Sequence, residues 1–102
     1  MCIFCSIISR EIPSIPVYED EKYIVINDIK PQARIDILLI PKKHIEAIFA
    51  LEDSDRDLMG GLLLLARDIG KKMNFPGYRL QFNVGEACGQ EVPHIHVHLL
   101  VD

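Results

Sequence analysis

The sequence predicts an α+β fold, with an antiparallel sheet of about five strands, one long helix and short helical turns. Two short apolar segments, 23–27 and 36–40, are separated by a turn and have the composition of paired strands. One longer stretch, 54–73, carries apolar residues at helical spacing, and two more strand-like segments follow it. Strands, then a helix, then strands is an order typical of an antiparallel sheet covered by a helix.

The length and composition indicate one globular domain over residues 1–102. Hydrophobic residues make up 49% of the chain and charged residues 25%, which excludes intrinsic disorder. No unbroken apolar run is longer than Leu62–Ala66, so no segment can span a bilayer. Met1–Ser9 has no basic stretch before its apolar residues and does not resemble a secretory signal. We therefore expect a cytoplasmic protein without a membrane partner.

The charge and cysteine content narrow the range of partners. With 11 basic and 15 acidic residues the net charge is −4, so no basic field exists for an extended nucleic-acid surface. A few local donors can still hold one small anion such as a phosphate. The chain has 3 cysteines, and a cytosolic protein rarely relies on disulfides. Metal binding or simple burial is the better expectation for them.

The first half of the chain predicts a helical turn and a hairpin. Cys2–Ile8 is apolar and short enough for a helical turn, and two prolines interrupt the segment after it. Tyr23–Asn27 is a strand, Asp28–Gln32 contains a proline and is a turn, and Asp36–Ile40 is a second strand that Pro41 closes. The short connection favours an antiparallel pair.

The second half begins with the long helix. Lys42–Leu51 precedes it, carries His44 and includes a helical turn. Ser54 is the expected N-cap, with acidic residues in the first turn and lysines in the last. One apolar stripe consists of Leu58, Leu62, Leu65, Ile69 and Met73, with Gly60 and Gly61 inside the pattern. The helix ends at 74–77.

A strand, a loop and a last strand complete the chain. Tyr78–Val84 alternates as a strand does, and Gly85–Pro93 is a glycine-containing loop. His94–Val101 is the last predicted strand, and its period of two places His94, His96 and His98 on one face. Such a row favours chemistry over a merely solvated surface.

Two kinds of chemistry fit these alternating histidines. They can chelate a catalytic metal, as in zinc hydrolases, or one of them can be a nucleophile that its neighbours assist. A neutral imidazole is available near neutral pH as a nucleophile towards phosphorus. The preceding segment 83–90 supplies amide donors and two glycines, which allow backbone N–H groups to approach an anion. That segment favours the nucleophile.

Four motifs together resemble the histidine triad superfamily of nucleotide hydrolases and transferases, and most of all its Hint-type phosphoramidase branch. They are His94-x-His96-x-His98 after Gly89-Gln90, Cys2-Ile3-Phe4-Cys5, the turn 27–33, and the segment 40–45. The resemblance implies a hydrolase that cleaves a phosphoramidate-type bond at the α-phosphate of a purine nucleotide, an AMP or GMP derivative, through a nucleotidyl-histidine. Two alternatives are a dinucleoside polyphosphate hydrolase of the same superfamily and a zinc- and nucleotide-binding regulatory module with little turnover.

The resemblance also implies roles for single residues. His96 matches the nucleophile, and His98 the histidine that contacts the phosphate and shares its protons. Asp28 matches the acid that accepts hydrogen bonds from the ribose hydroxyls, as a carboxylate does well. The phosphate and leaving-group contacts match Asn83, Gly89 and Gln90. Candidates for the base pocket, unless they are ordinary core residues, are Ile7, Ile26 and Ile29.

Two features depart from the Hint branch. Glu91 stands where these enzymes often carry a serine near the leaving group, and a carboxylate cannot donate a proton there unless it is itself protonated. The branch also continues past the position of Asp102 with a tail that helps to select the leaving group. The sequence therefore leaves the leaving group, the physiological substrate and the purine preference open.

The resemblance further implies a structural zinc ion and a homodimer, but no organic cofactor. Some bacterial members bind zinc through residues that match Cys2, Cys5, His44 and His94, a suitable ligand set. Hint-type proteins are two-fold dimers with a helix and a strand at the interface. The long helix carries a second small or apolar stripe that a partner would cover, formed by Met59, Leu63, Ala66 and Gly70.

Overall fold

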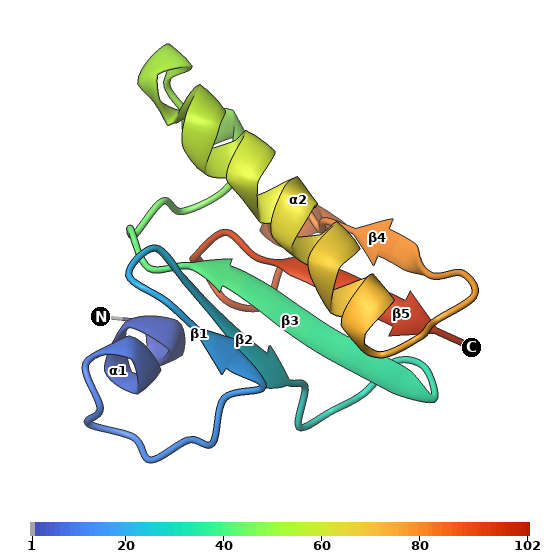
Figure 1. Ribbon diagram of the computed structural model, residues 1–102. Coiled ribbons are helices and arrows are strands. Elements are labelled where there is room, and N and C mark those ends of the chain that lie inside the picture. The colour runs from blue at the N-terminus through green and yellow to red at the C-terminus, as the bar shows by residue number, and fades with distance from the viewer. Residues whose placement is uncertain (1) are drawn as a thin grey trace.

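The computed structural model describes residues 2–102, and its strands form one antiparallel sheet in the order β1-β2-β3-β5-β4 (Figure 1). The strands are β1 (Tyr18–Glu19), β2 (Tyr23–Asn27), β3 (Ile35–Pro41), β4 (Arg79–Gln81) and β5 (Val97–Val101). The helices are α1 (Ile3–Ile8) and α2 (Arg56–Lys72), with 3-10 turns η1 (Ile48–Ala50), η2 (Asp53–Asp55) and η3 (Glu86–Cys88). This arrangement confirms the α+β class, the five strands and the single long helix.

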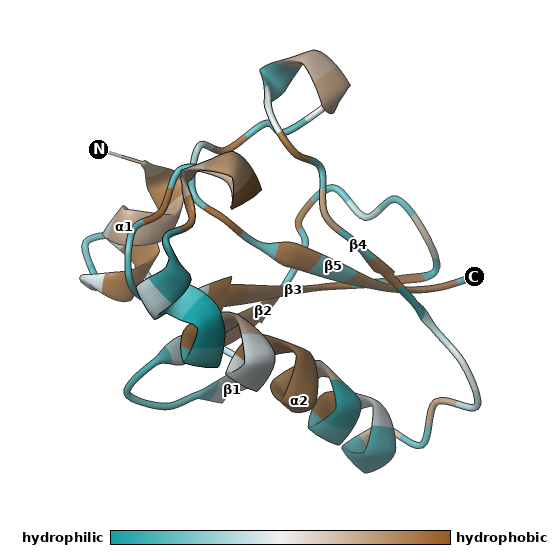
Figure 2. Cartoon of the chain, turned by 90° about the horizontal axis from the view of Figure 1, so that it is seen from above, coloured by the Kyte–Doolittle hydropathy of each residue, from teal (hydrophilic) through white to brown (hydrophobic). Residues whose placement is uncertain are grey.

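Each face of the sheet is covered by a different helix. Side chains alternate along a strand, so β2, β3 and β5 each supply residues to both faces. The α2 face packs Val25, Ile37, Leu39, Val97 and Leu99 against Leu62, Ala66 and Ile69. The α1 face packs Ile24, Ile26, Leu38 and Ile40 against Phe4 and Cys2. Burial on both faces explains why the central strands are almost continuously apolar, as their colour in Figure 2 shows.

The long helix begins later than the sequence indicates. Ser54 is exposed and lies inside η2, so the expectation of an N-cap there is wrong; Asp55 is the residue that precedes α2. The carboxylate of Asp55 is buried and accepts hydrogen bonds from Glu52 N–H at 2.9 Å and from Lys43 Nζ at 2.6 Å. These two bonds fix the turn that starts the helix. Among residues 2–102, no helix combines the length and apolar character needed to cross a membrane.

The two apolar stripes of α2 are not divided as the sequence indicates. Ala66 and Gly70, expected on the stripe that a partner would cover, are buried in the protomer's own core. Met73, expected on the core stripe, is 43% exposed. Because Ala66 and Gly70 are small, the helix can approach the sheet closely at these positions, and both residues lie on its inner face. Leu63 and its neighbour Leu64 remain exposed.

Both C-terminal strands are shorter than predicted. β5 begins at Val97, because the backbone ahead of it bonds to loops: His94 N–H donates to Val92 O at 2.8 Å and Ile95 N–H to Ile45 O at 2.7 Å. β4 pairs with β5 only as far as Gln81, opposite His98. Since its partner starts at Val97, β4 cannot continue to residue 84. His94, Ile95 and His96, which precede β5, are all buried.

Candidate active site and metal cluster

A cavity of about 300 Å³ lies on the α1 face of the sheet, where α1, the turn after β2 and the loop before β5 meet. Ile3, Phe4 and Ile7 of α1 form one wall. The cavity brings together most of the residues that the sequence singled out: Ile7, Ile26, Asp28, Ile29, Asn83, Gly89, Glu91, His96 and His98. Side chains from four separate segments of the chain thus share one space.

His96 is buried at this cavity, and its hydrogen bond fixes its tautomer. Its Nδ1 lies 2.7 Å from the backbone oxygen of His94, and a carbonyl can only accept, so Nδ1 carries the proton. Nε2 is then the nitrogen with the lone pair. Burial lowers the pKa of His96 below its ordinary value, and the neighbouring His98 acts in the same direction, although the bond to the carbonyl opposes them. The ring is therefore neutral at neutral pH.

His98 sits beside His96, with ring centroids 5.3 Å apart, and holds a carboxylate that the sequence did not single out. Its Nδ1 lies 2.9 Å from Oδ1 of Asp36, a residue of β3 whose side chain is fully buried. Asp36 and His98 are diagonal neighbours, because Asp36 pairs with Leu100 and His98 with Leu38 across the two strands. The sequence did contain one sign of this role, because Asp36 is the only charged residue in the otherwise apolar strand β3.

Asp28 stands at the rim of the cavity, at the end of β2. Its Oδ1 accepts a hydrogen bond from Lys30 N–H at 2.9 Å, which holds the turn, and its Oδ2 lies 3.8 Å from Nδ1 of His98. Burial, and the nearby carboxylate of Asp36, raise the pKa of Asp28 above its ordinary value. The carboxylate presents acceptor oxygens beside a largely apolar wall.

In the loop before β5, Gly89 and Glu91 face the cavity, whereas Gln90 does not. Gly89 has a φ of 88°, in the left-handed region that favours glycine, and lines the cavity together with Glu91. Gln90 does not line it. Its side chain accepts from Gly85 N–H at 2.8 Å and donates to Glu46 O at 2.6 Å, so it holds the loop against the segment after β3.

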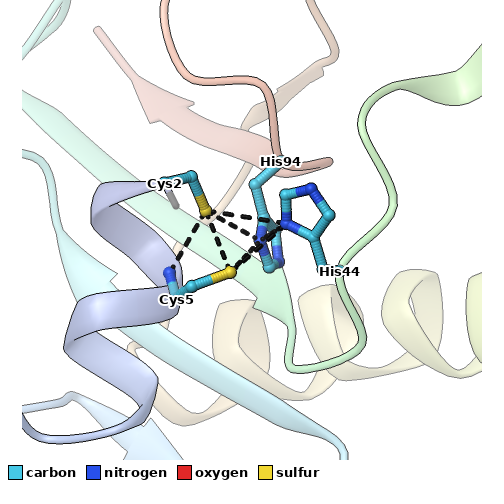
Figure 3. Close-up of side chains that lie close together, drawn as sticks. All are labelled: Cys2, Cys5, His44 and His94. Carbon is cyan, nitrogen blue, oxygen red and sulfur yellow. Dashed lines mark hydrogen bonds between the residues drawn. The ribbon is translucent and has the colours of Figure 1, made fainter.

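Beside the cavity, two cysteines and two histidines converge from three segments (Figure 3). Cys5 comes from α1 and Cys2 directly precedes it, His44 lies in the segment after β3 and His94 in the segment before β5. The Sγ of Cys2 lies 3.3 Å from Nδ1 of His94, and that of Cys5 lies 3.3 Å from Nδ1 of His44. The two sulfurs are 3.1 Å apart, and so are the two nitrogens.

The donor set of this cluster fits a tetrahedral zinc ion. With Zn–S near 2.3 Å and Zn–N near 2.0–2.1 Å, tetrahedral sulfur and nitrogen ligands lie roughly 3.6 Å apart, and the four sulfur–nitrogen separations here run from 3.3 to 3.7 Å. The two sulfurs, 3.1 Å apart, are closer than the roughly 3.8 Å of a zinc-bound pair. Nε2 of His94 lies 2.7 Å from Pro41 O and therefore carries that ring's proton. Its Nδ1 keeps the lone pair that faces the sulfurs, as second-shell bonding to a metal-ligating histidine requires.

Comparison with known proteins finds close relatives over the whole chain. The family described as scavenger mRNA decapping enzyme C-term binding matches residues 1–102. Protein HitA of Neisseria gonorrhoeae is 37% identical over 100 residues, which cover 97% of this chain and 94% of HitA. An HIT-like protein of Synechocystis is 41% identical, over 96% of this chain and 87% of its own.

Solved structures agree with these matches. A HIT family hydrolase from Legionella pneumophila superposes with a TM-score of 0.94 at 44% identity, covering 99% of this chain and 92% of that one. A histidine triad protein from Clostridium difficile gives 0.93 at 39% identity, covering 99% and 90%. At these identities the similarity extends beyond the fold to the amino-acid sequence.

Proposed function

Because the chain belongs to the histidine triad family and its solved neighbours include HIT family hydrolases, we propose that it cleaves a phosphoramidate-type bond at the α-phosphate of a purine nucleotide. Nε2 of His96 attacks the α-phosphorus, and the bond from phosphorus to the leaving nitrogen breaks. Water then attacks the nucleotidyl-histidine, releases the nucleotide and returns the electron pair to Nε2. The protein acts in the cytoplasm on a small nucleotide, without a nucleic-acid partner.

One observation carries this proposal: His96 is a buried, neutral imidazole with its Nδ1 proton on a carbonyl, at a cavity that also contains Asp28. The free Nε2 is the nitrogen that a nucleophile needs. Asp28 supplies ribose acceptors, and Asn83 with the backbone at Gly89 supplies phosphate donors. The apolar wall of Ile7, Ile26 and Ile29 suits a purine base. Glu91 also lines the cavity, where related enzymes often have a serine, so the group released with the nitrogen has still to be identified.

His96→Ala tests the proposal directly. We expect turnover of adenosine phosphoramidate to fall by a factor of at least about 10², since the attacking nitrogen is lost. AMP binding should change little, because Asp28 and Asn83 remain. In the wild type, denaturation during turnover should trap a covalent nucleotide that mass spectrometry places on the 94–98 segment. Full activity in the variant would refute the role of His96.

The rival within the family is hydrolysis of a dinucleoside polyphosphate, which the same chemistry permits. Product analysis with diadenosine polyphosphate and adenosine phosphoramidate side by side separates the two, since only the preferred substrate disappears at low enzyme concentration. A regulatory module would bind AMP but turn over neither substrate. A zinc hydrolase with three histidine ligands is disfavoured, because Nδ1 of His94 faces the cysteines while His96 and His98 line the cavity.

We also propose that Cys2, Cys5, His44 and His94 hold a structural zinc ion. When bound, the metal would cross-link α1 to the segments before and after the central strands, and it takes no part in the phosphoryl chemistry. Its absence should loosen α1, and with α1 the wall formed by Phe4, whose ring also contacts His96 edge-on at 5.0 Å.

Cys2→Ser with Cys5→Ser tests the metal site, and Cys88→Ser is the matched control because Cys88 is exposed and outside the cluster. Elemental analysis of protein purified without chelators should give one zinc per chain in the wild type and control, and none in the double variant. The double variant should also melt at a lower temperature. A metal-free wild type, or an unchanged melting temperature after zinc is lost, would contradict the site.

A further inference from the structure

Asp36 is a buried carboxylate in a place where the fold calls for an apolar side chain. Its neighbours on the same face of β3 are Leu38 and Ile40, which belong to the core, and its own side chain has no exposed surface. Burying a carboxylate lowers stability unless hydrogen bonds satisfy it. A residue of this kind inside a central strand therefore indicates a role beyond packing.

Both oxygens of Asp36 are used as acceptors. Oδ1 faces Nδ1 of His98 at 2.9 Å, and Oδ2 accepts from the backbone N–H of Gln32 at 3.1 Å. An ionised carboxylate can only accept, so the proton between Asp36 and His98 belongs to Nδ1. The turn 28–36 is closed from the other side, since Asp28 N–H donates to Asp36 O at 2.9 Å. The carboxylate thus has a fixed position.

This arrangement determines which nitrogen of His98 faces the cavity. With Nδ1 committed to Asp36, Nε2 is left with a lone pair beside His96. His96 has the same tautomer for a different reason, the carbonyl of His94. The second carboxylate near the ring, Asp28, lies 3.8 Å from the same Nδ1 and cannot replace this bond.

We propose that Asp36 is a positioning residue for the hydrolysis described above: it holds His98 with Nδ1 protonated, so that Nε2 can serve the reacting phosphate. The inference rests on the proposed function. When the covalent intermediate is hydrolysed, the water oxygen bonds to phosphorus and the phosphorus–Nε2 bond to His96 breaks. The electron pair returns to His96, and the proton of the water goes to Nε2 of His98. The imidazolium so formed is stabilised by Asp36 and later protonates the next leaving nitrogen.

Asp36→Asn is the test, because it keeps the size of the side chain and reverses its hydrogen bonding. The amide oxygen can still accept from Gln32 N–H, and the amide nitrogen must then donate to Nδ1 of His98. The proton of His98 moves to Nε2, the wrong nitrogen for the cavity. We expect kcat to fall about a hundredfold or more with KM within about threefold, as for loss of a general base.

Nitrogen-detected NMR of the histidine rings reads the tautomer without any substrate. In the wild type Nδ1 of His98 should carry a proton, and in Asp36→Asn it should not. Asp28→Asn is the matched comparison: it should leave the proton of His98 on Nδ1 and raise KM instead. If Asp36→Asn does not fold, the wild-type spectrum decides alone, and an unprotonated Nδ1 would overturn the proposal.

The two arms separate this inference from the proposed function. A wild type that hydrolyses no phosphoramidate or dinucleotide would defeat the proposed function, while the ring spectrum would still show whether Asp36 sets the tautomer. An active wild type whose Asp36→Asn variant keeps its kcat would defeat the positioning role and leave the role of His96 intact. A loss of kcat with an unchanged His98 tautomer would also overturn it.

Discussion

At the scale of single residues, hydrogen bonds divide the three alternating histidines between two tasks. His94 donates from Nε2 to Pro41 O, which leaves Nδ1 for the cluster with the cysteines. His96 and His98 donate from Nδ1, which leaves Nε2 for the cavity. Residues of the same type on one face of the chain therefore present different nitrogens to different partners. Backbone carbonyls and one carboxylate make this selection, without any change in the histidines themselves.

Asp28→Asn should weaken nucleotide binding more than it slows the chemistry. A carboxylate that accepts from both ribose hydroxyls makes bonds worth about 1.5–3 kcal/mol each, so the Kd for AMP should rise roughly tenfold to a hundredfold. Isothermal titration calorimetry measures it, with His96→Ala as the control that retains its affinity. An unchanged Kd in Asp28→Asn would remove Asp28 from the binding site.

The same residue gives a dependence on pH. Burial and the carboxylate of Asp36 raise the pKa of Asp28, so the wild type loses its charged acceptor as the pH falls through a value above that of an ordinary aspartate. As the pH is lowered through that value, the AMP affinity of the wild type should fall more than that of Asp28→Asn, because the asparagine side chain does not titrate. Parallel curves for the two proteins would show that Asp28 does not bind the ribose as a carboxylate.

The sequence predicts part of this site and not the rest, for a physical reason. Alternation along one segment was enough to place His96 and His98 on a common face. Asp36 is 62 positions away from His98, and only the register between β3 and β5 makes them diagonal neighbours. Gln90 was predicted at the site from its place in the motif, but its amide already bonds to Glu46 O and Gly85 N–H, which the sequence could not reveal.

At the scale of elements, the short helix α1 contributes to two sites. Cys5 of α1 and Cys2, which immediately precedes the helix, belong to the metal cluster. Its residues Ile3, Phe4 and Ile7 form a wall of the cavity. A helix of 6 residues is not stable alone, so its position depends on these contacts. The shape of the nucleotide pocket is thus tied to the packing around the cluster.

Gly61→Ala should destabilise the protein although alanine is the better helix former. A Cβ at position 61 would collide with the hydroxyl of Tyr23, which donates a hydrogen bond to Leu58 O at 2.7 Å. Tyr23 and α2 would have to separate, and overpacking of this kind lowers the free energy of unfolding by about 1–3 kcal/mol. Urea denaturation measures the change.

Gly60→Ala is the matched control for this close approach. A Cβ there meets no atom within 4 Å, so the substitution should raise the free energy of unfolding by up to about 1 kcal/mol, as expected from helix propensity. Opposite signs at adjacent glycines would confirm that the contact with Tyr23, and not backbone entropy, determines the effect at 61. Equal stabilisation at both positions would contradict it.

The limits of the elements were harder to predict than their existence. The start of α2 depends on Asp55, whose burial beneath Lys43 and bond to Glu52 N–H come from tertiary structure. The extent of β4 depends on β5, which starts at Val97, whereas β5 runs beyond β4 at both ends because it also pairs with β3. Local propensity gives no information about either, whereas periodicity over 17 residues was enough to establish α2.

At the scale of the whole molecule, we propose that two copies associate through α2 and the edge of the sheet. Leu63 and Leu64 are 50% and 53% exposed on α2, and Leu80 is 40% exposed on the edge strand β4. Ala66 and Gly70 are buried within the protomer, so the interface is narrower than the stripe predicted from the sequence. A two-fold contact would let the same leucines face each other.

Leu63→Glu should convert the dimer into a monomer, because each dimer would otherwise bury two unpaired carboxylates. Light scattering over a dilution series measures the molecular mass. Ile15→Glu is the control, since Ile15 is 95% exposed in the loop before β1 and lies outside the proposed interface. A wild type that is monomeric at micromolar concentration would refute the interface.

The strand order has a consequence for how the chain acquires its structure during synthesis. β5 lies between β3 and β4 although it follows both in sequence, and it supplies Val97, Leu99 and Val101 to the core under α2. Until β5 has left the ribosome, β4 has no partner and α2 has no complete surface to cover. A nascent chain can form the β2–β3 hairpin early, but the remainder must wait for non-local pairing. The strand that completes the fold also carries His98, so a nascent chain whose β5 has not yet emerged can have neither a finished sheet nor a competent site.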